Sequence, residues 1–446
     1  MIQKTDCFIA CQTLADAQPA IDQLQRSYAV RHIWLLVNAS MAANCVAPKG
    51  CSFLVTDSLQ STYFLLSLAK HAVAPYILLC QKAQPLLLGA NMLERMMQVA
   101  SDTEAAMVYS DRYTVENGQR KPHPVIDYQT GSLRDDFDFG SVWLVRTSLL
   151  HKYASSERER DYQYAALYDL RLFLSREGNL IHLNEYLYTE EESDLRTSGE
   201  KQFDYVNPRN REVQNEMEQA CTAHLRAINA LVDTTQYGEI DYNEQEFETE
   251  ASVIIPVYNR EKTIRDAVDS ALSQKATFKY NVIVVDNHSS DGTSDILSEM
   301  LEKYGDKLHV IVPERTDLGI GGCWNEAVMS PFCGRFAVQL DSDDLYSSPK
   351  TLQTIVDAFY EQQAAMVVGS YRMCDFELNT LPPGLIDHRE WTDENGPNNA
   401  LRINGLGAPR AFFTPLLRSV GFPNTSYGED YALGLWFSRR YRIGRI

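Results

Sequence analysis

The chain has 446 residues, the length of two or three ordinary domains, and 44% of them are hydrophobic, which is enough for sizeable cores. Its formal net charge of −19 argues against non-specific binding to nucleic acid or to an anionic membrane surface. The sequence has no apolar run near the roughly 18 residues of a membrane span, no visible signal peptide and no C-x-x-C pair among its nine cysteines, so it favours a cytoplasmic protein with reduced thiols.

Residues 1–190 are predicted to form a first α/β domain. Short apolar runs that are typical of buried strands lie at 8–10, 33–37 and 76–80. Residues 191–250 are predicted to form a linker, because apolar residues recur at helical spacing between 212 and 232 and an acidic stretch without a basic residue follows at 239–250. A solvated linker explains that acidic stretch better than a recruitment motif does.

Residues 251–446 are predicted to form a second α/β domain. Apolar runs typical of buried parallel strands lie at 253–257, 282–285, 309–312 and 336–340. Helical patterns separate them, and Asn259 can cap the first of these helices. Strands and helices that alternate at these spacings indicate a doubly wound, mostly parallel sheet flanked by helices.

The two predicted domains resemble each other in sequence. Residues 104–113 match 363–372, with Ala105 and Ala364 lying 259 positions apart. Two further matches keep the same order, 140–150 with 407–417 and 168–183 with 431–446, at offsets of 267 and 263. A period near 260 residues is too long for a solenoid repeat, so we expect two tandem domains.

Polar and acidic residues follow three of the predicted strands of the second domain. The segments are Pro256–Asn259, Asp286–Asp291 and Asp341–Asp344. Each segment alone has a plainer explanation, as a turn, a polar loop or an acidic helix start. Because ligands of open α/β sheets bind outside the carboxyl ends of the strands, the convergence of all three segments at one edge favours a binding site.

The acidic segment is suited to a divalent cation. Asp341 and Asp343, spaced D-x-D, can offer carboxylates to Mg²⁺ or Mn²⁺, which shares its other positions with water and substrate phosphates. Such an ion would neutralise a departing nucleoside diphosphate. Asp430, in the acidic pair Glu429-Asp430, could take a proton from an acceptor hydroxyl, although the pair could equally be the capped start of a helix.

Four motifs together resemble the family 2 inverting glycosyltransferases of GT-A fold, a Rossmann-like architecture. They are SVIIPVYN (252–259), VVDNHSSDGT (284–293), LDSDD (340–344) and GED (428–430), and the resemblance covers about 195 residues from Ala251 onward. It implies an enzyme that uses a nucleoside-diphosphate sugar, with a UDP-sugar as the first choice. The acceptor would be a glycan or a lipid-linked glycan in surface polysaccharide synthesis, with peripheral association to the inner face of a membrane as an option and the oligomeric state left open.

The resemblance also implies roles for individual residues. Asp343 with Asp341 would bind the metal, Asp430 would be the base with Glu429 beside it, and Trp391, Leu406 and Gly407 would shape the acceptor side. The donor would be bound by Pro256, Tyr258, Asn259, Asp286, Asn287, Ser289, Asp291, Gly292, Gly319, Asn325 and Asp341.

The first domain departs from this pattern. Lys82, Ala83 and Gln84 fall opposite the D-x-D segment, and Ala166-Leu167 fall opposite Glu429-Asp430, so the first domain is expected to be a degenerate, catalytically silent copy. The second domain is expected to be truncated, because Ile446 aligns with Leu183 and the family usually continues into a closing segment.

Two other functions were weighed. A nucleotide-sugar-binding scaffold with weak or no turnover would suit a truncated domain. A sugar nucleotidyltransferase would need a Gly-rich, basic loop after the first strand, where this chain has Pro256–Arg260, and it is therefore disfavoured.

Overall fold

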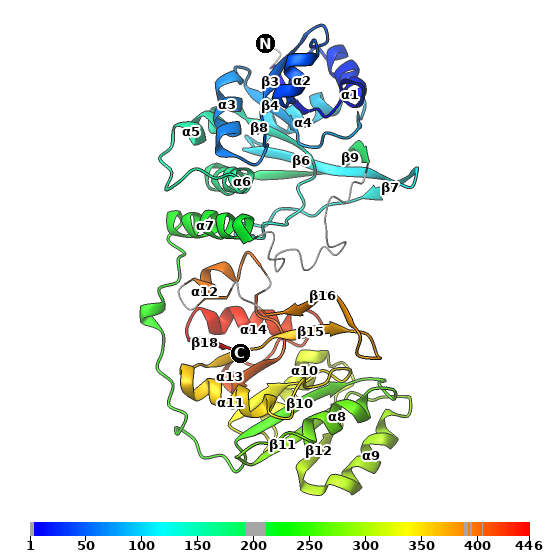
Figure 1. The fold of residues 1–446 in the computed structure, drawn as a ribbon, viewed down its shortest axis with the longest axis vertical. Helices are drawn as coiled ribbons and strands as arrows, with labels where there is room; N and C mark the ends of the chain where they lie inside the picture. The colour runs from blue at the N-terminus through cyan, green and yellow to red at the C-terminus, as the bar shows by residue number, and fades with distance from the viewer. Residues whose placement is uncertain (1–3, 192–210, 388–390, 393–394, 404) are drawn as a thin grey trace. The chain divides into compact units, whose positions relative to one another are not determined.

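The computed structural model divides the chain into two compact units, residues 1–231 and 232–446 (Figure 1). It describes residues 4–191, 211–387, 391–392, 395–403 and 405–446. The expected linker is shared between the units. Helix α7 (Arg211–Ala227) packs Ala220, Cys221 and Leu225 into the core of the first unit, whereas Tyr242 lies in the core of the second.

The first unit contains one large mixed sheet. Its strands are β1 (Thr5–Ala10), β2 (Val30–Val37), β3 (Cys51–Val55), β4 (Tyr76–Cys80), β5 (Leu86–Leu88), β6 (Met107–Glu116), β7 (Gln119–His123), β8 (Val142–Arg146) and β9 (Leu180–Glu191). Its helices, besides α7, are α1 (Leu14–Arg26), α2 (Ala39–Asn44), α3 (Thr62–His71), α4 (Met92–Asp102), α5 (Thr147–Ser155) and α6 (Ala166–Glu177). The strands are ordered β3-β2-β1-β4-β8-β6-β9-β5, with β7 paired to β6.

The second unit is built around a seven-stranded sheet. Its strands, with the separate hairpin β15–β16, are β10 (Ala251–Val257), β11 (Tyr280–Asp286), β12 (Leu308–Ile311), β13 (Phe336–Gln339), β14 (Met366–Val368), β15 (Tyr371–Cys374), β16 (Thr380–Ile386), β17 (Arg410–Phe413) and β18 (Ile443–Arg445). Its helices are α8 (Ile264–Leu272), α9 (Thr293–Tyr304), α10 (Ile320–Met329), α11 (Thr351–Gln362), α12 (Gly396–Asn399), α13 (Thr414–Val420) and α14 (Glu429–Ser438), with short 3₁₀ turns η3 (Thr234–Gln236) and η4 (Gly305–Lys307). The order in the large sheet is β12-β11-β10-β13-β17-β14-β18.

The two sheets share one strand order. The order is the same when each strand of the second sheet is matched to one strand of the first: β10 to β1, β11 to β2, β12 to β3, β13 to β4, β17 to β8, β14 to β6 and β18 to β9. The directions also agree, since β8 and β17 each run antiparallel to both neighbours and the other pairs in this series are parallel. The predicted fold class, two tandem α/β domains with mostly parallel sheets flanked by helices, is confirmed.

The strand registers define which residues of the two sheets are equivalent. Met107 pairs with Val145 as Met366 pairs with Phe412, which reproduces the sequence offsets of 259 and 267. Between the β4–β8 and β13–β17 ladders, however, Leu79 is equivalent to Gln339, an offset of 260. Asp341 therefore corresponds to Gln81 rather than to Lys82, because the segment between this strand and the next matched strand is one residue longer in the first unit.

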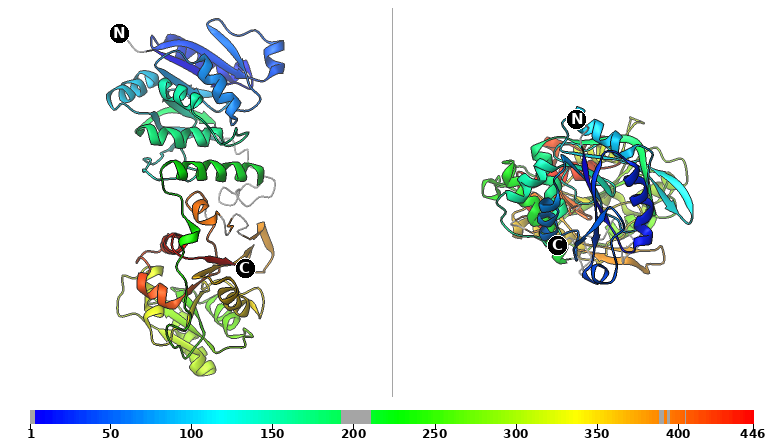
Figure 2. Two further views of the ribbon diagram at one scale, coloured as in Figure 1. Left: turned by 90° about the vertical axis from the view of Figure 1, so that its left-hand side faces the viewer. Right: turned by 90° about the horizontal axis from the view of Figure 1, so that it is seen from above.

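Each sheet is covered by helices on both faces (Figures 1 and 2). Side chains alternate along each strand, so that Val253 and Ile255 face one core while Ile254 faces the other. In the second unit, α8, α9 and α11 line the first of these cores, and α10, α13 and α14 line the second. Strands buried on both faces need continuous apolar sequence, and the carboxyl ends of the parallel strands are left free for polar loops.

Candidate functional site

Two loops at the carboxyl ends of β10 and β11 are joined by hydrogen bonds. The amide of Asn259 donates to Ser289 Oγ at 3.0 Å, and the amide of Ser290 donates to Asn259 Oδ1 at 2.7 Å. The amide of Glu261 donates to Asp291 Oδ2 at 3.1 Å. Three of the residues expected to bind the donor, Asn259, Ser289 and Asp291, are thus joined in one rim.

Asn259 does not cap a helix, contrary to the sequence-based expectation. Helix α8 begins at Ile264 after Thr263, and Asn259 adopts a left-handed backbone conformation with a φ of 53°. An asparagine tolerates this conformation better than most residues do. Its side chain instead accepts the hydrogen bond from the amide of Ser290 across the rim.

The end of β11 buries polar groups in the rim. Asp286 is 2% exposed, and its carboxylate accepts from the amide of Ser289 at 3.0 Å and from Ser294 Oγ at 2.5 Å. Asn287 donates to the carbonyl of Leu318 at 2.9 Å, while its Oδ1 atom is buried without a hydrogen-bond partner among the described residues. A buried unpaired acceptor is costly unless a ligand donates to it. Tyr258, which precedes Asn259 at the same rim, is 56% exposed.

Three carboxylates gather immediately after β13. Asp341, Asp343 and Asp344 keep contact with solvent, yet the carboxylates of Asp341 and Asp344 lie among many protein atoms. This desolvation, followed by the charges of Asp341 and Asp343, raises the pKa of Asp344 to about 6. Desolvation also raises the pKa of Asp341, the hydrogen bond from Gln339 opposes the rise, and the charges of Asp343 and Asp430 add to it. The cluster therefore carries unneutralised negative charge.

The acidic pair from the end of the chain lies at this cluster. Glu429 and Asp430 form the first turn of α14, after Gly428 in a left-handed conformation. Asp430 and Asp341 are close enough for the charge of Asp430 to raise the pKa of Asp341. Glu429 is 7% exposed, its Oε2 atom has no hydrogen-bond partner among the described residues, and burial is the first cause that raises its pKa. The expected base and the expected metal ligands are thus brought together.

Two arginines at the site were missed by sequence reasoning. Arg410 Nη2 lies 2.7 Å from Asp430 Oδ2, and Arg260 Nε lies 3.4 Å from Asp343 Oδ2. Tyr371, at the start of β15, also faces the site, because the charges of Arg410 and Asp344 act on its hydroxyl. A single arginine or tyrosine between motifs carries no sequence signal. Only the pairing of β13 with β17 could have indicated Arg410.

The GIGGCWN segment (319–325), expected to contact the donor, packs against the loop that precedes α14. Asn325 lies on α10, donates to the carbonyl of Phe422 at 2.9 Å and accepts from the amide of Phe422 at 2.8 Å, so its amide is committed to that loop. A side chain at Gly319 would come within 2.6 Å of the backbone of Thr425. The small glycines and Asn325 thus allow this segment to pack closely against residues 422–425. Gly292, by contrast, remains at the rim, where its amide donates to Glu261 Oε2 at 3.0 Å.

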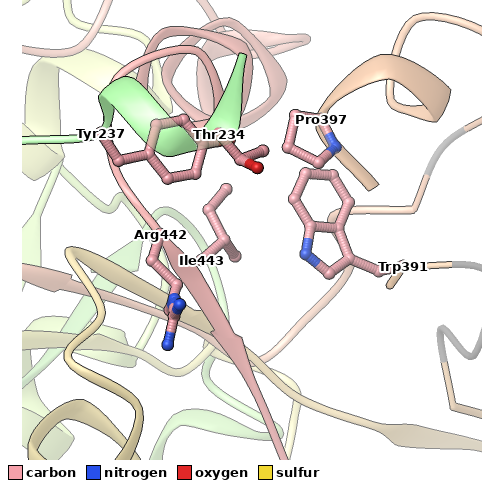
Figure 3. Close-up of a pocket in the computed structure, with 6 residues that line it drawn as sticks. All are labelled: Thr234, Tyr237, Trp391, Pro397, Arg442 and Ile443. Atoms are coloured by element: carbon pink, nitrogen blue, oxygen red, sulfur yellow. The ribbon is translucent and has the colours of Figure 1, made fainter. Parts of the chain in front are cut away.

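Trp391 and Leu406 are core residues, contrary to the expectation that they shape the acceptor side. Leu406 is fully buried, and the indole of Trp391 lies against Gly396, where a side chain would come within 2.7 Å of the ring. Gly407, which follows Leu406, is also buried. Figure 3 shows a pocket of about 60 Å³ lined by Thr234, Tyr237, Trp391, Pro397, Arg442 and Ile443. It is too small for a nucleotide sugar, since ligand pockets usually hold about 300–1,000 Å³.

The corresponding edge of the first unit is neutralised internally. Glu190, 2% exposed, lies 2.7 Å from Lys82 Nζ and 2.8 Å from Arg112 Nε. Its other oxygen accepts from Ser141 Oγ, and Arg112 also pairs with Asp138 at 2.9 Å. Each buried charge in this network has an opposite charge within hydrogen-bond distance, which removes the electrostatic reason for a bound cation.

Within the described part of the chain, no group of three or more His, Cys, Asp or Glu side chains is arranged to hold a metal ion. The protein thus offers two carboxylates at most from Asp341 and Asp343. That arrangement is the one used by Mg²⁺ and Mn²⁺ sites completed by substrate phosphates. No described helix is both long and apolar enough to cross a membrane.

Residues 252–417 match the family described as Glycosyl transferase family 2, so the second unit contains a domain of this family. The poly(ribitol-phosphate) beta-glucosyltransferase of Bacillus spizizenii is 36% identical over 105 residues, which are 23% of this chain and 16% of that protein. The minor teichoic acid biosynthesis protein GgaA of Bacillus subtilis is 31% identical over 117 residues, 25% of each chain. This chain spans less than half the length of such curated relatives.

Solved structures align over a similar share of the chain. TarS residues 1–349 from S. aureus align with a TM-score of 0.34 and 26% identity, covering 44% of this chain and 58% of that one. The mannosyltransferase PcManGT from Pyrobaculum calidifontis, in complex with GDP-Man and Mn²⁺, aligns with a TM-score of 0.32 and 20% identity, covering 46% and 61%.

Proposed function

We propose that the second unit is an inverting glycosyltransferase. It would transfer a sugar from a nucleoside-diphosphate donor, with a UDP-sugar as the first choice, to a hydroxyl of a glycan or lipid-linked acceptor in surface polysaccharide synthesis. The family match and the relatives in teichoic acid and poly(ribitol-phosphate) glycosylation support this class of reaction.

One observation carries the proposal. Asp341 and Asp430 lie far apart in the sequence, yet they share a site in which the charge of Asp430 raises the pKa of Asp341. The fold alone does not require this, because neighbouring carboxylates repel each other and cost stability. Carboxylates that are clustered despite this repulsion are therefore expected to bind a cation and to accept a proton during the reaction.

The carboxylates fit a divalent metal. Asp343 and Asp341 would hold Mg²⁺ or Mn²⁺. Desolvation and then the charges of these two residues raise the pKa of Asp344, and such a cation would relieve the contribution of the charges. When bound, the ion would supply Lewis-acid neutralisation of the leaving diphosphate. The rim formed by Asn259, Asp286 and Ser289 would hold the nucleoside, and Asn287 Oδ1 would accept a hydrogen bond from it.

The protein's own part in the chemistry is proton removal. Asp430 would accept the proton of the acceptor hydroxyl while the hydroxyl oxygen forms a bond to the anomeric carbon. The bond from that carbon to the diphosphate oxygen breaks at the same time, and its electron pair leaves with the diphosphate. Attack from the side opposite the leaving group inverts the anomeric centre.

A second candidate is a nucleotide-sugar-binding scaffold without turnover. It is favoured by the two arginines, because Arg410 and Arg260 pair with the expected base and metal ligand. In either case we propose that the first unit is a silent copy that stabilises the chain or positions the acceptor.

The test is a nucleotide screen followed by a turnover assay. Thermal unfolding of the full chain is measured with UDP, GDP, ADP and CDP, each with Mn²⁺ and with excess EDTA. The sugar nucleotides of the base that stabilises most are then assayed for release of the nucleoside diphosphate. Binding with turnover supports the transferase, binding without turnover supports the scaffold, and no stabilisation by any nucleotide contradicts both.

A further inference from the structure

A chain of hydrogen bonds joins Asp430 to Asp341. Arg410 Nη2 pairs with Asp430 Oδ2 at 2.7 Å, and Arg410 Nη1 donates to Gln339 Oε1 at 3.0 Å. Gln339 Nε2 in turn donates to Asp341 Oδ1 at 2.9 Å. The side chain of Arg410 is only 11% exposed, so these bonds form largely out of water, where they are stronger.

The pairing of two strands fixes this arrangement. In the β13–β17 ladder, Phe336 pairs with Phe413 and Val338 with Ala411, so Gln339 and Arg410 follow as the next opposed pair. Arg410 Nε also donates to the carbonyl of Leu406 at 2.6 Å, which holds the guanidinium from a third direction. An arginine can only donate and a carboxylate can only accept, so the amide of Gln339 has one orientation that satisfies both neighbours.

The first unit shows that the fold does not need these polar groups. In its equivalent ladder Leu79 pairs with Trp143, in the positions of Gln339 and Arg410. Leu167 stands where the sequence alignment places Asp430, and all three apolar residues belong to one hydrophobic core. Three of the four members of the polar chain, Gln339, Arg410 and Asp430, are therefore replaced by packed apolar side chains in the unit that also lacks the acids.

We propose that Arg410 and Gln339 are positioning residues that hold the carboxylate of Asp430 in register with the donor-binding Asp341. This inference rests on the proposed transferase function. The guanidinium of Arg410 is itself held by Gln339 and the carbonyl of Leu406, so it presents its charge to Asp430 Oδ2 from a fixed position. Asp430 Oδ1 accepts from the amide of Tyr431 at 2.6 Å. Since each carboxylate oxygen can accept two hydrogen bonds, lone pairs remain for the acceptor hydroxyl.

The experiment compares three variants of the full chain with the donor identified by the nucleotide screen. Arg410→Leu is expected to lower kcat by about 10- to 100-fold while the Kd for the nucleoside diphosphate with Mn²⁺ changes by less than about 3-fold. Arg410→Lys is expected to recover part of the loss, because one ammonium group restores the charge but not the fork geometry. Gln339→Met keeps the side-chain length without hydrogen bonds and is expected to have a smaller effect than Arg410→Leu.

Two controls separate positioning from stability. Arg418, in the same unit, donates to the backbone carbonyls of Val328 and Ser330, so Arg418→Leu removes comparable bonds away from the site and is expected to leave kcat unchanged. In an Asp430→Asn background, Arg410→Leu is expected to have no further effect, since it acts through that carboxylate. If Arg410→Leu fails to fold, Arg410→Lys and Gln339→Met carry the comparison.

Each contrary outcome has a distinct meaning. An active wild type together with a fully active Arg410→Leu would overturn the positioning role alone. Effects of Arg410→Leu and Asp430→Asn that multiply would overturn it as well, because the two residues would then act independently. A loss of nucleotide affinity as large as the loss of kcat/KM would make Arg410 a donor ligand instead. A wild type that neither binds nor turns over any nucleotide would remove the transferase function, and the positioning role with it.

Discussion

The same edge of the sheet carries opposite electrostatics in the two units. In the second unit, Asp341, Asp343 and Asp344 crowd together, and the pKa of Asp344 rises to about 6 through desolvation and then through its acidic neighbours. In the first unit, Glu190 is enclosed by Lys82 and Arg112 at hydrogen-bond distance. One edge is left with excess negative charge, whereas the other is neutral by its own side chains.

This difference separates what the fold requires from what a ligand requires. Both edges end the same strands in the same order, so neither arrangement is imposed by the topology. The internally paired edge is complete without a partner. The edge of the second unit is called the unpaired edge below because its acids outnumber Arg260 and Arg410, and its charge is balanced only with a cation, protons or both. Substitutions at the two edges test whether this electrostatic difference determines what each unit binds.

The largest effect is expected from the base. Asp430→Asn keeps the shape of the side chain but cannot accept a proton at neutral pH. It is expected to lower sugar transfer by roughly 10²- to 10⁴-fold while the affinity for the nucleoside diphosphate stays nearly constant. The matched control is Asp169→Asn, which changes a half-buried acid on the equivalent helix α6 of the first unit and is expected to leave transfer unchanged. Transfer at the wild-type rate by Asp430→Asn would make Asp430 a structural group.

The second prediction breaks the paired edge. Glu190→Gln leaves Arg112, whose side chain is 9% exposed, without its closest counter-charge, and is expected to destabilise the first unit by about 3 kcal/mol. Hydrogen exchange of the full chain measures this unit by unit. Glu185 lies on the same strand and pairs with Arg95, but both side chains are at least 40% exposed. Glu185→Gln is therefore expected to cost less than about 1 kcal/mol, and equal effects of the two changes would refute the distinction.

The third prediction concerns the metal at the unpaired edge. Asp343→Asn removes one of two carboxylates and is expected to reduce the gain in nucleoside-diphosphate affinity on adding Mn²⁺ by at least about 10-fold. Calorimetric titrations of UDP and GDP with Mn²⁺ and with EDTA measure this gain. Asp306→Asn, at an exposed position in η4, serves as the control. Wild-type affinity that is the same in EDTA would exclude a metal from nucleotide binding.

Local patterns were sufficient to predict the strands β1, β2, β4, β10, β11, β12 and β13, but not the remaining strands of the two units. The continuous apolar runs at 253–257 and 282–285 predict strands that are buried on both faces, and the structure has β10 and β11 there. The D-x-D segment was recognised because it directly follows such a run. Asn325, Trp391 and Leu406 were assigned to ligand contacts, yet they pack against loops and core residues. Their environment is created by distant segments: the partner of Asn325 is Phe422, nearly a hundred residues further along the chain.

Arg410 and Glu190 are charged residues with important contacts that sequence patterns did not indicate. Neither stands in a motif, and each acquires its role only when two strands pair or two segments meet. Non-local pairing of this kind has no signature in one sequence. The internal comparison of the two units supplies part of the missing information, because equivalent positions can be compared after their registers are known.

The smallest effect is expected from the stored charge at the unpaired edge. The pKa of Asp344 is about 6 in the folded state and lies near 3.8 in an unfolded chain. Between these values the folded state binds the additional proton, so stability falls as pH rises through this window and stays lower above it. Asp344→Asn removes that charge. The variant is expected to raise the unfolding temperature of the second unit at pH 7.5 by a few degrees at most, because Asp344 keeps contact with solvent.

The pH dependence provides the decisive check on this last expectation. At pH 4.5 Asp344 is already protonated in the folded protein, so Asp344→Asn should have almost no effect there. Saturating Mn²⁺ at pH 7.5 should also shrink the difference, because the cation neutralises the same charge. The first unit offers no equivalent gain, since neutralising Glu190 removes a partner rather than a repulsion. A variant that stabilises equally at both pH values would show that packing, and not charge, sets the effect at this edge.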